Sequence, residues 1–67
     1  MLSDRVRQIL DNFGLSQNAF ARALGISQSN VHAWLHGGNM PQTTAMAIEL
    51  ARGVRWQWLL TGEGEIM

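Results

Sequence analysis

The stretch that decides the fold runs from Ser16 to His36 and reads SQNAFARALGISQSNVHAWLH. Its apolar residues recur at helical spacing, which predicts two short helices over residues 17–24 and 28–36. Ser16 is the expected N-cap of the first helix. Gly25 is expected to end that helix, because glycine accepts the left-handed backbone that commonly follows a helix. A turn of three residues then joins the two helices.

The second helix has two unlike faces. Val31, Trp34 and Leu35 cover one arc of the helical wheel and are predicted to be buried. An arc about 140° away carries an amide, a hydroxyl, two imidazoles and a methyl group, with no charge. It consists of Gln28, Ser29, His32, Ala33 and His36. Such groups read base edges in the major groove, but they are also ordinary surface residues, so the wheel alone leaves both interpretations open.

The connection between the helices favours DNA readout. A three-residue turn with glycine is typical of the helix-turn-helix motif, whose second helix enters the major groove. Ala21 is small where the helices would cross, and Ile26 and Val31 are expected to fill the angle between them. Ser27 is the expected N-cap of the second helix. Similar helix pairs occur in proteins that never touch DNA, so this pattern alone does not decide the function.

Three further helices complete an all-α prediction. The first is expected from about Ser3, its proposed N-cap, to Phe13. Another begins near Pro41, because proline suits the first helical position, and ends near Gly53. One face of that helix carries Thr43, Ala47, Leu50 and Ala51, opposite Glu49 and Arg52. A short last helix is expected over residues 55–60.

Length and charge limit the alternatives. The 67 residues are expected to form one domain over 1–62 and a tail or the start of a linker over 63–67. The formal net charge is zero, which counts against DNA binding because phosphate contact usually leaves a basic footprint. Two of the five acids, Glu63 and Glu65, lie in the tail, however. Residues 1–62 therefore carry five arginines against three acids.

Residues 15–38 resemble the helix-turn-helix of lambda-repressor-like and Cro-like regulators. The similarity continues through Pro41, through Ala51-Arg52-Gly53-Val54 and through Trp58-Leu59-Leu60-Thr61-Gly62-Glu63-Gly64. That ending is similar to the end of the DNA-binding domain of temperate-phage repressors, just before their linker. The resemblance implies a compact, five-helix, lambda-repressor-like domain that binds duplex DNA. It covers nearly the whole chain.

The resemblance also implies roles for single residues. Base-reading roles fall on Gln28, Ser29, Asn30 and His32, to which the polar face adds Ala33. Phosphate contacts fall on Gln17, His36, Gly38 and Asn39, with Asn18 and Arg22 as further candidates on the first helix of the motif. Gln17 would also brace the second helix. The sequence leaves Arg5, Arg7 and Arg55 open between phosphate contact and an ordinary solvated surface.

The two histidines have a second interpretation. His32 and His36 are four residues apart, a spacing that can chelate a metal ion. A zinc site needs a third ligand and the chain has no cysteine, so neither a metal nor any other cofactor is expected. Facing DNA, the imidazoles would change charge between about pH 5 and 8, and tighter binding is expected at lower pH.

The last tryptophans suggest a partner surface. Trp34 and Trp58 are expected in the core, whereas Trp56 is two residues from Trp58 and cannot face the same way on a helix. A surface aromatic often marks a contact, so Trp56, with Ile66 and Met67, is a candidate contact of a homodimer. The alternative is a partly covered surface tryptophan.

The expected function is transcriptional repression through double-stranded DNA, with a palindromic operator whose half-sites are about one helical turn apart. No pair of acids or nucleophile elbow indicates an enzyme or a small-molecule substrate. The competing function is a helical protein-interaction module, such as an antitoxin or co-regulator docking domain. No apolar run is long enough to span a bilayer, so the expected location is the bacterial cytoplasm, in association with the nucleoid.

Overall fold

The computed structural model describes all of residues 1–67 as five α-helices without a strand, which confirms the all-α prediction. The helices are α1 (Leu2–Phe13), α2 (Gln17–Leu24), α3 (Gln28–Leu35), α4 (Gln42–Arg52) and α5 (Trp56–Thr61). The expected start of the first helix was wrong. Met1 occupies the N-cap and Ser3 lies inside the first turn, because the apolar side of α1 already begins at Leu2.

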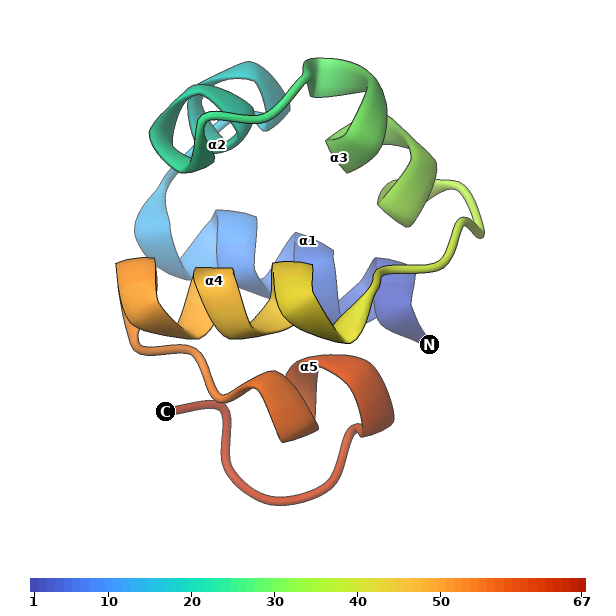
Figure 1. The fold of residues 1–67 in the computed structure, drawn as a ribbon, viewed down its shortest axis with the longest axis vertical. Helices are drawn as coiled ribbons and strands as arrows, with labels where there is room; N and C mark the ends of the chain where they lie inside the picture. The colour runs from blue at the N-terminus through green and yellow to red at the C-terminus, as the bar shows by residue number, and fades with distance from the viewer.

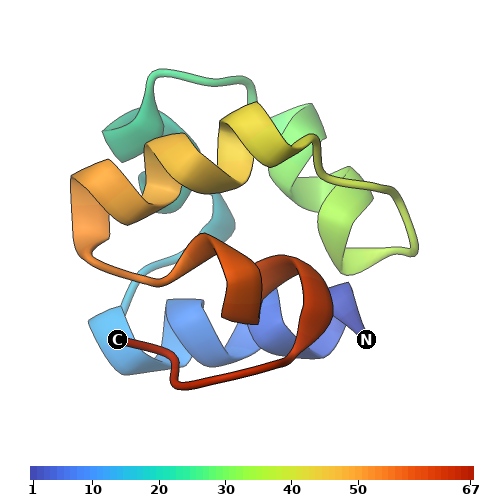
Figure 2. The ribbon, with the colours of Figure 1, turned by 60° about the horizontal axis from the view of Figure 1, so that its bottom comes forward.

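The helices are arranged along an axis 27 Å long (Figure 1). α2 and α3 form one end of the molecule, α5 forms the other end, and α1 and α4 lie between them. α5 packs against both α1 and α4, and Figure 2 shows it lying across α1. None of the helices combines the length and the apolar character that crossing a membrane requires.

The core is built from 14 buried residues, all of them apolar. Every helix contributes, and the two loops beside α4 add Met40 and Val54. The largest side chains that are fully enclosed are Phe20, Ile9, Ile48 and Leu59. Trp34 and Trp58 are buried as expected. Because no buried side-chain nitrogen or oxygen atom lacks a partner, the core carries no uncompensated polar group.

The face of α4 that packs against the protein is not the face that carries Leu50. Ala45 and Ile48 are buried, whereas Leu50 is 91% exposed. Glu49 and Arg52, which lie opposite the face with Leu50, are half-buried and have partners. Glu49 accepts a hydrogen bond from the start of α5, and the guanidinium of Arg52 lies 5.5 Å from the centre of an aromatic ring of α1. These contacts favour the observed rotation of α4.

α5 has six residues and is held at both ends by side chains of other helices. The N–H of Trp56 donates to Glu49 Oε1 over 2.9 Å. Arg5 of α1 donates from Nε to the carbonyl of Leu59 over 2.7 Å and from Nη2 to the carbonyl of Leu60 over 3.1 Å. A carboxylate at the N-terminus and a guanidinium at the C-terminus both complement the helix dipole. Since a helix this short is marginal alone, these contacts fix it.

The residues after α5 fold back onto the domain. Gly62 ends the helix with φ 79°, and the amide of Glu63 donates to Thr61 Oγ1. The carbonyl of Ile66 accepts a hydrogen bond of 2.9 Å from the amide of Arg55, and the Ile66 side chain packs against the core. The boundary between domain and linker at residue 62 stays a prediction.

Candidate nucleic-acid interface

The connection between α2 and α3 has the tight geometry that the sequence predicted. Gly25 adopts φ 70°, and its amide donates to the carbonyl of Arg22. The next amide, that of Ile26, donates to the carbonyl of Ala21 over 3.0 Å. Ala21 and Val31 are buried, and Ile26 packs half-buried against the core. The two helices are therefore fixed relative to each other by backbone hydrogen bonds and by apolar packing.

The serines before the two helices behave differently. Ser16 Oγ accepts from the amide of Ala19 over 3.1 Å, which confirms it as the N-cap of α2. Ser27 occupies the N-cap position of α3, but its hydroxyl makes no capping hydrogen bond. At the start of α2 the amides of Gln17 and Asn18 make no hydrogen bond, as is usual for the first turn of a helix. They are free to donate to an anion.

α3 separates a buried side from an exposed side. Val31, Trp34 and Leu35 anchor the helix in the core, as the helical wheel predicted. The proposed base-reading residues, Gln28, Ser29, Asn30, His32 and Ala33, are all exposed. Gln28, Ser29 and His32 together line a shallow depression of the surface. We call the exposed side formed by Gln28, Ser29, His32, Ala33 and His36 the reading face.

The two histidines of the reading face touch each other. The ring centroids of His32 and His36 lie 4.1 Å apart, with the ring planes inclined by 35°. The sequence assigned the first to a base and the second to a phosphate. The signal for their contact was present in the four-residue spacing, because residues four apart are neighbours on a helix.

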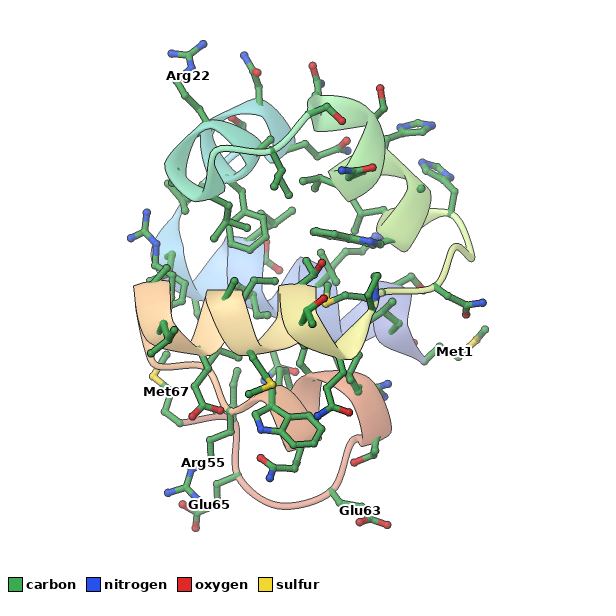
Figure 3. All side chains as sticks on the ribbon, viewed as in Figure 1. Met1, Arg22, Arg55, Glu63, Glu65 and Met67 are labelled. Atoms are coloured by element: carbon green, nitrogen blue, oxygen red, sulfur yellow. The ribbon has the colours of Figure 1, made fainter.

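The predicted phosphate contacts lie around the reading face. Arg22 projects from the end of the molecule formed by α2 and α3 (Figure 3). Asn18 and Asn39 are exposed, whereas Gln17 is half-buried. The side chain of Gln17 makes no hydrogen bond within the protein. The bracing of α3 by Gln17 that the resemblance implied therefore stays a prediction.

Gly38 has a structural reason to be glycine. Its amide donates to the carbonyl of Ala33 over 2.7 Å. A Cβ atom at position 38 would lie 2.7 Å from the same carbonyl oxygen, closer than real Cβ atoms come. The loop after α3 therefore needs a residue without a side chain here to stay close to the helix.

The remaining arginines are mostly engaged inside the protein. Arg5 caps α5, Arg7 Nη2 lies 3.5 Å from the carbonyl of Leu35, and Arg52 lies over Phe13. Sequence reasoning missed these roles, because the partners of Arg5 and Arg7 are far away in the chain. Figure 3 places Arg55, Glu63 and Glu65 at the end opposite Arg22. α2 and α3 carry one arginine and no acid, so the zero net charge of the chain conceals a positive α2–α3 end.

Comparison with known proteins adds an independent finding. The family model of the bacteriophage CI repressor helix-turn-helix domain matches residues 4–67. The chain belongs to this family. The family consists of DNA-binding domains of transcriptional regulators, which confirms the resemblance to phage repressors that the sequence indicated. The matched residues include α2, the turn and α3.

Relatives of the CI repressor domain are regulators of mobile DNA. The chain is 35% identical over 65 residues to the HTH-type transcriptional regulators for conjugative elements R391 of Providencia rettgeri and SXT of Vibrio cholerae. It is 33% identical over 63 residues to the repressor protein CI of Enterobacteria phage phi80. These alignments cover 97%, 97% and 94% of this chain but only 30%, 30% and 27% of the relatives. No solved structure matches the chain.

Proposed function

We propose that this domain represses transcription by binding a palindromic operator as a homodimer, with α3 in the major groove of each half-site. The observation that carries the proposal is the reading face, an exposed and uncharged row of amide, hydroxyl and imidazole groups on the second helix of a CI-type helix-turn-helix. Side chains of this kind recognise base edges by hydrogen bonds, and Ala33 suits the methyl group of thymine.

Contacts with the DNA backbone would position α3. With α3 in the groove, the free amides at the start of α2 are suited to a phosphate on one side. Arg22 and Asn18 are exposed on the same helix, and Asn39 is exposed beyond the other end of α3. Because few cations are available, these neutral donors carry much of the phosphate contact, and we expect a shallow dependence of affinity on salt.

The proposed dimer uses the surface of α4, α5 and the C-terminal residues. Trp56 and Ile66 are both half-buried and pack against the core. Exposed apolar side chains nearby in the chain are Met46, Leu50 and Met67. Figure 3 shows Met67 on the flank of the molecule, away from the α2–α3 end that carries Arg22. A contact there would leave both reading faces free for two half-sites about 34 Å apart.

Sedimentation tests the dimer separately from DNA binding. Wild type and Trp56→Ala are compared over a range of concentrations. We expect wild type to dimerise at the higher concentrations and Trp56→Ala to remain monomeric. If both proteins are monomeric at every concentration, this dimer surface is wrong.

The relatives suggest the biological setting. They are named as regulators of conjugative elements and as a phage repressor, so we propose that this domain regulates genes of a mobile element. A repressor bound to its operator would be found with the bacterial nucleoid.

Selection from a library of random duplexes tests the function. The proteins are wild type, the double variant Gln28→Ala/Ser29→Ala, and Gln8→Ala as a matched control whose exposed amide lies on α1, outside the reading face and the proposed dimer surface. We expect wild type and the control to enrich the same palindrome and the double variant to lose or change it. If wild type enriches no sequence, or if all three proteins enrich the same one, the reading face is not the recognition surface.

A further inference from the structure

The rings of His32 and His36 contact each other, and separate base and phosphate roles for the two residues do not explain this contact. His32 is exposed on α3, and its imidazole makes no hydrogen bond with the protein. An exposed imidazole of this kind would normally rotate between several orientations. Here its ring is covered on one side by the ring of His36, at a centroid distance of 4.1 Å. The contact restricts where the two nitrogen atoms of His32 can point.

The backbone fixes the position of His36 independently of its ring. His36 follows the last helical residue, and its amide donates to the carbonyl of Ala33 over 3.1 Å. The same carbonyl accepts a second hydrogen bond, of 2.7 Å, from Gly38. Between them Gly37 adopts φ 93°, a backbone conformation that favours glycine. The chain therefore turns tightly against the end of α3 and fixes the backbone of His36, whose ring lies 4.1 Å from that of His32.

We propose that His36 is a positioning residue, whose ring holds the imidazole of His32 in the orientation that reads one base pair. This inference rests on the proposed function and goes beyond it, because it gives His36 a role in sequence specificity in place of a phosphate contact. The two nitrogen atoms of an imidazole point in different directions, so a change of ring orientation changes which base edge they meet.

Stacking also lowers the entropic cost of recognition. A side chain that is already restricted in the free protein loses less freedom when it binds, which is the advantage of preorganisation. Aromatic contacts of this kind have a modest free energy, which corresponds to an effect of about threefold to tenfold on affinity. Phenylalanine keeps a stacking ring at position 36 but cannot donate to a phosphate. The two roles of His36 are therefore separable by substitution.

The test compares wild type with His36→Ala, His36→Phe and His32→Ala on the selected operator and on every single base-pair change within it. We expect His36→Ala to lose about threefold to tenfold in affinity and to lose discrimination at the base pair that His32→Ala also affects. We expect His36→Phe to keep that discrimination. In the free proteins, His36→Ala should change the NMR chemical shifts of the His32 ring protons, because the neighbouring ring is lost. His36→Phe keeps a neighbouring ring and should preserve a ring-current effect on these protons. Both positions are exposed, and equal melting temperatures serve as the check on folding.

Two results overturn the inference while leaving the proposed function in place. One is that both His36 variants discriminate between base pairs as well as the wild-type protein does. The other is a loss of affinity in His36→Phe as large as in His36→Ala and spread evenly over all base pairs, which indicates a phosphate contact. A wild-type protein without any preferred sequence overturns the proposed function itself, and the inference with it.

Discussion

The α2–α3 end and the α5 end of the molecule use their polar side chains differently. At the α5 end, Glu49 and Arg5 hydrogen-bond to the two ends of one short helix. At the α2–α3 end, the polar side chains of the reading face make no hydrogen bond within the protein. Polar groups that are satisfied inside a chain contribute to folding, and exposed polar groups without partners are available to a ligand. Substitutions at the two ends should therefore change different measurements.

The largest effect is expected on the reading face. Gln28→Ala/Ser29→Ala removes two groups that would hydrogen-bond base edges, each worth about 1–3 kcal/mol of discrimination. We expect operator affinity to fall by about 2–6 kcal/mol per half-site, roughly thirtyfold to more than ten-thousandfold, while the free energy of unfolding changes by less than about 0.5 kcal/mol. Fluorescence anisotropy with labelled operator and urea unfolding measure the two quantities. If the free energy of unfolding falls as much as the operator affinity, the reading face also contributes to folding, as the polar side chains of the α5 end do.

The reverse pattern is expected at the other end. Arg5→Ala leaves the carbonyls of Leu59 and Leu60 without their donors, and hydrogen bonds from charged groups contribute about 1.5–3 kcal/mol. We expect unfolding in urea to become easier by about 1–3 kcal/mol, with operator affinity per folded dimer almost unchanged. Arg55→Ala is the matched control, because its exposed side chain makes no hydrogen bond. A loss of stability as large in Arg55→Ala would mean that overall charge, and not the capping of α5, is responsible.

The difference between the two ends also explains what the sequence could predict. α2, the turn and α3 were predicted closely, because their signals lie within a few residues: Ser16, Gly25 and the alternation of apolar and polar faces. The capping of α5 by Arg5 was not predicted, because donor and acceptor are separated by 54 and 55 positions in the chain. No local pattern records such a pairing.

The packing of α4 also could not be predicted from a local sequence pattern. Its residues offer two stripes of comparable apolar character, one with Leu50 and one with Ile48. Periodicity alone does not choose between them. The choice depends on α5, whose first amide pairs with Glu49, and on the ring of Phe13 beneath Arg52. By contrast, the exposure of each reading-face residue followed from the helical wheel, and the contact between the rings of His32 and His36 is consistent with their four-residue spacing.

A smaller effect is expected from the one arginine at the α2–α3 end. Arg22→Ala and Arg55→Ala each remove one positive charge, but Figure 3 places the two side chains at opposite ends. We expect Arg22→Ala to weaken binding several-fold for every DNA sequence and to reduce the slope of log affinity against log salt by about one per subunit, about two for the dimer. Arg55→Ala should leave the slope unchanged. Equal slopes in both variants would mean that Arg22 makes no local phosphate contact.

The smallest effect is expected from a change of pH. This effect should depend on the two histidines of the reading face. DNA is an anion, so a histidine near it binds a proton more readily in the complex than in the free protein. By linkage, affinity must then rise as pH falls through the range in which imidazoles titrate. Between about pH 8 and pH 6 we expect a gain of a few-fold in wild type.

Variants at the two histidines assign this pH dependence. Because each imidazole can take up one proton and a dimer brings both of its subunits to the operator, the slope of log affinity against pH should not exceed about four in wild type or about two in His36→Phe. His32→Ala/His36→Ala should bind with nearly constant affinity over the same range. An affinity that stays flat or falls in wild type on acidification would mean that neither imidazole lies against the DNA. His32 would then be a polar residue that contacts only the protein, as Glu49 and Arg5 do at the α5 end. The difference between the two ends would not extend to position 32.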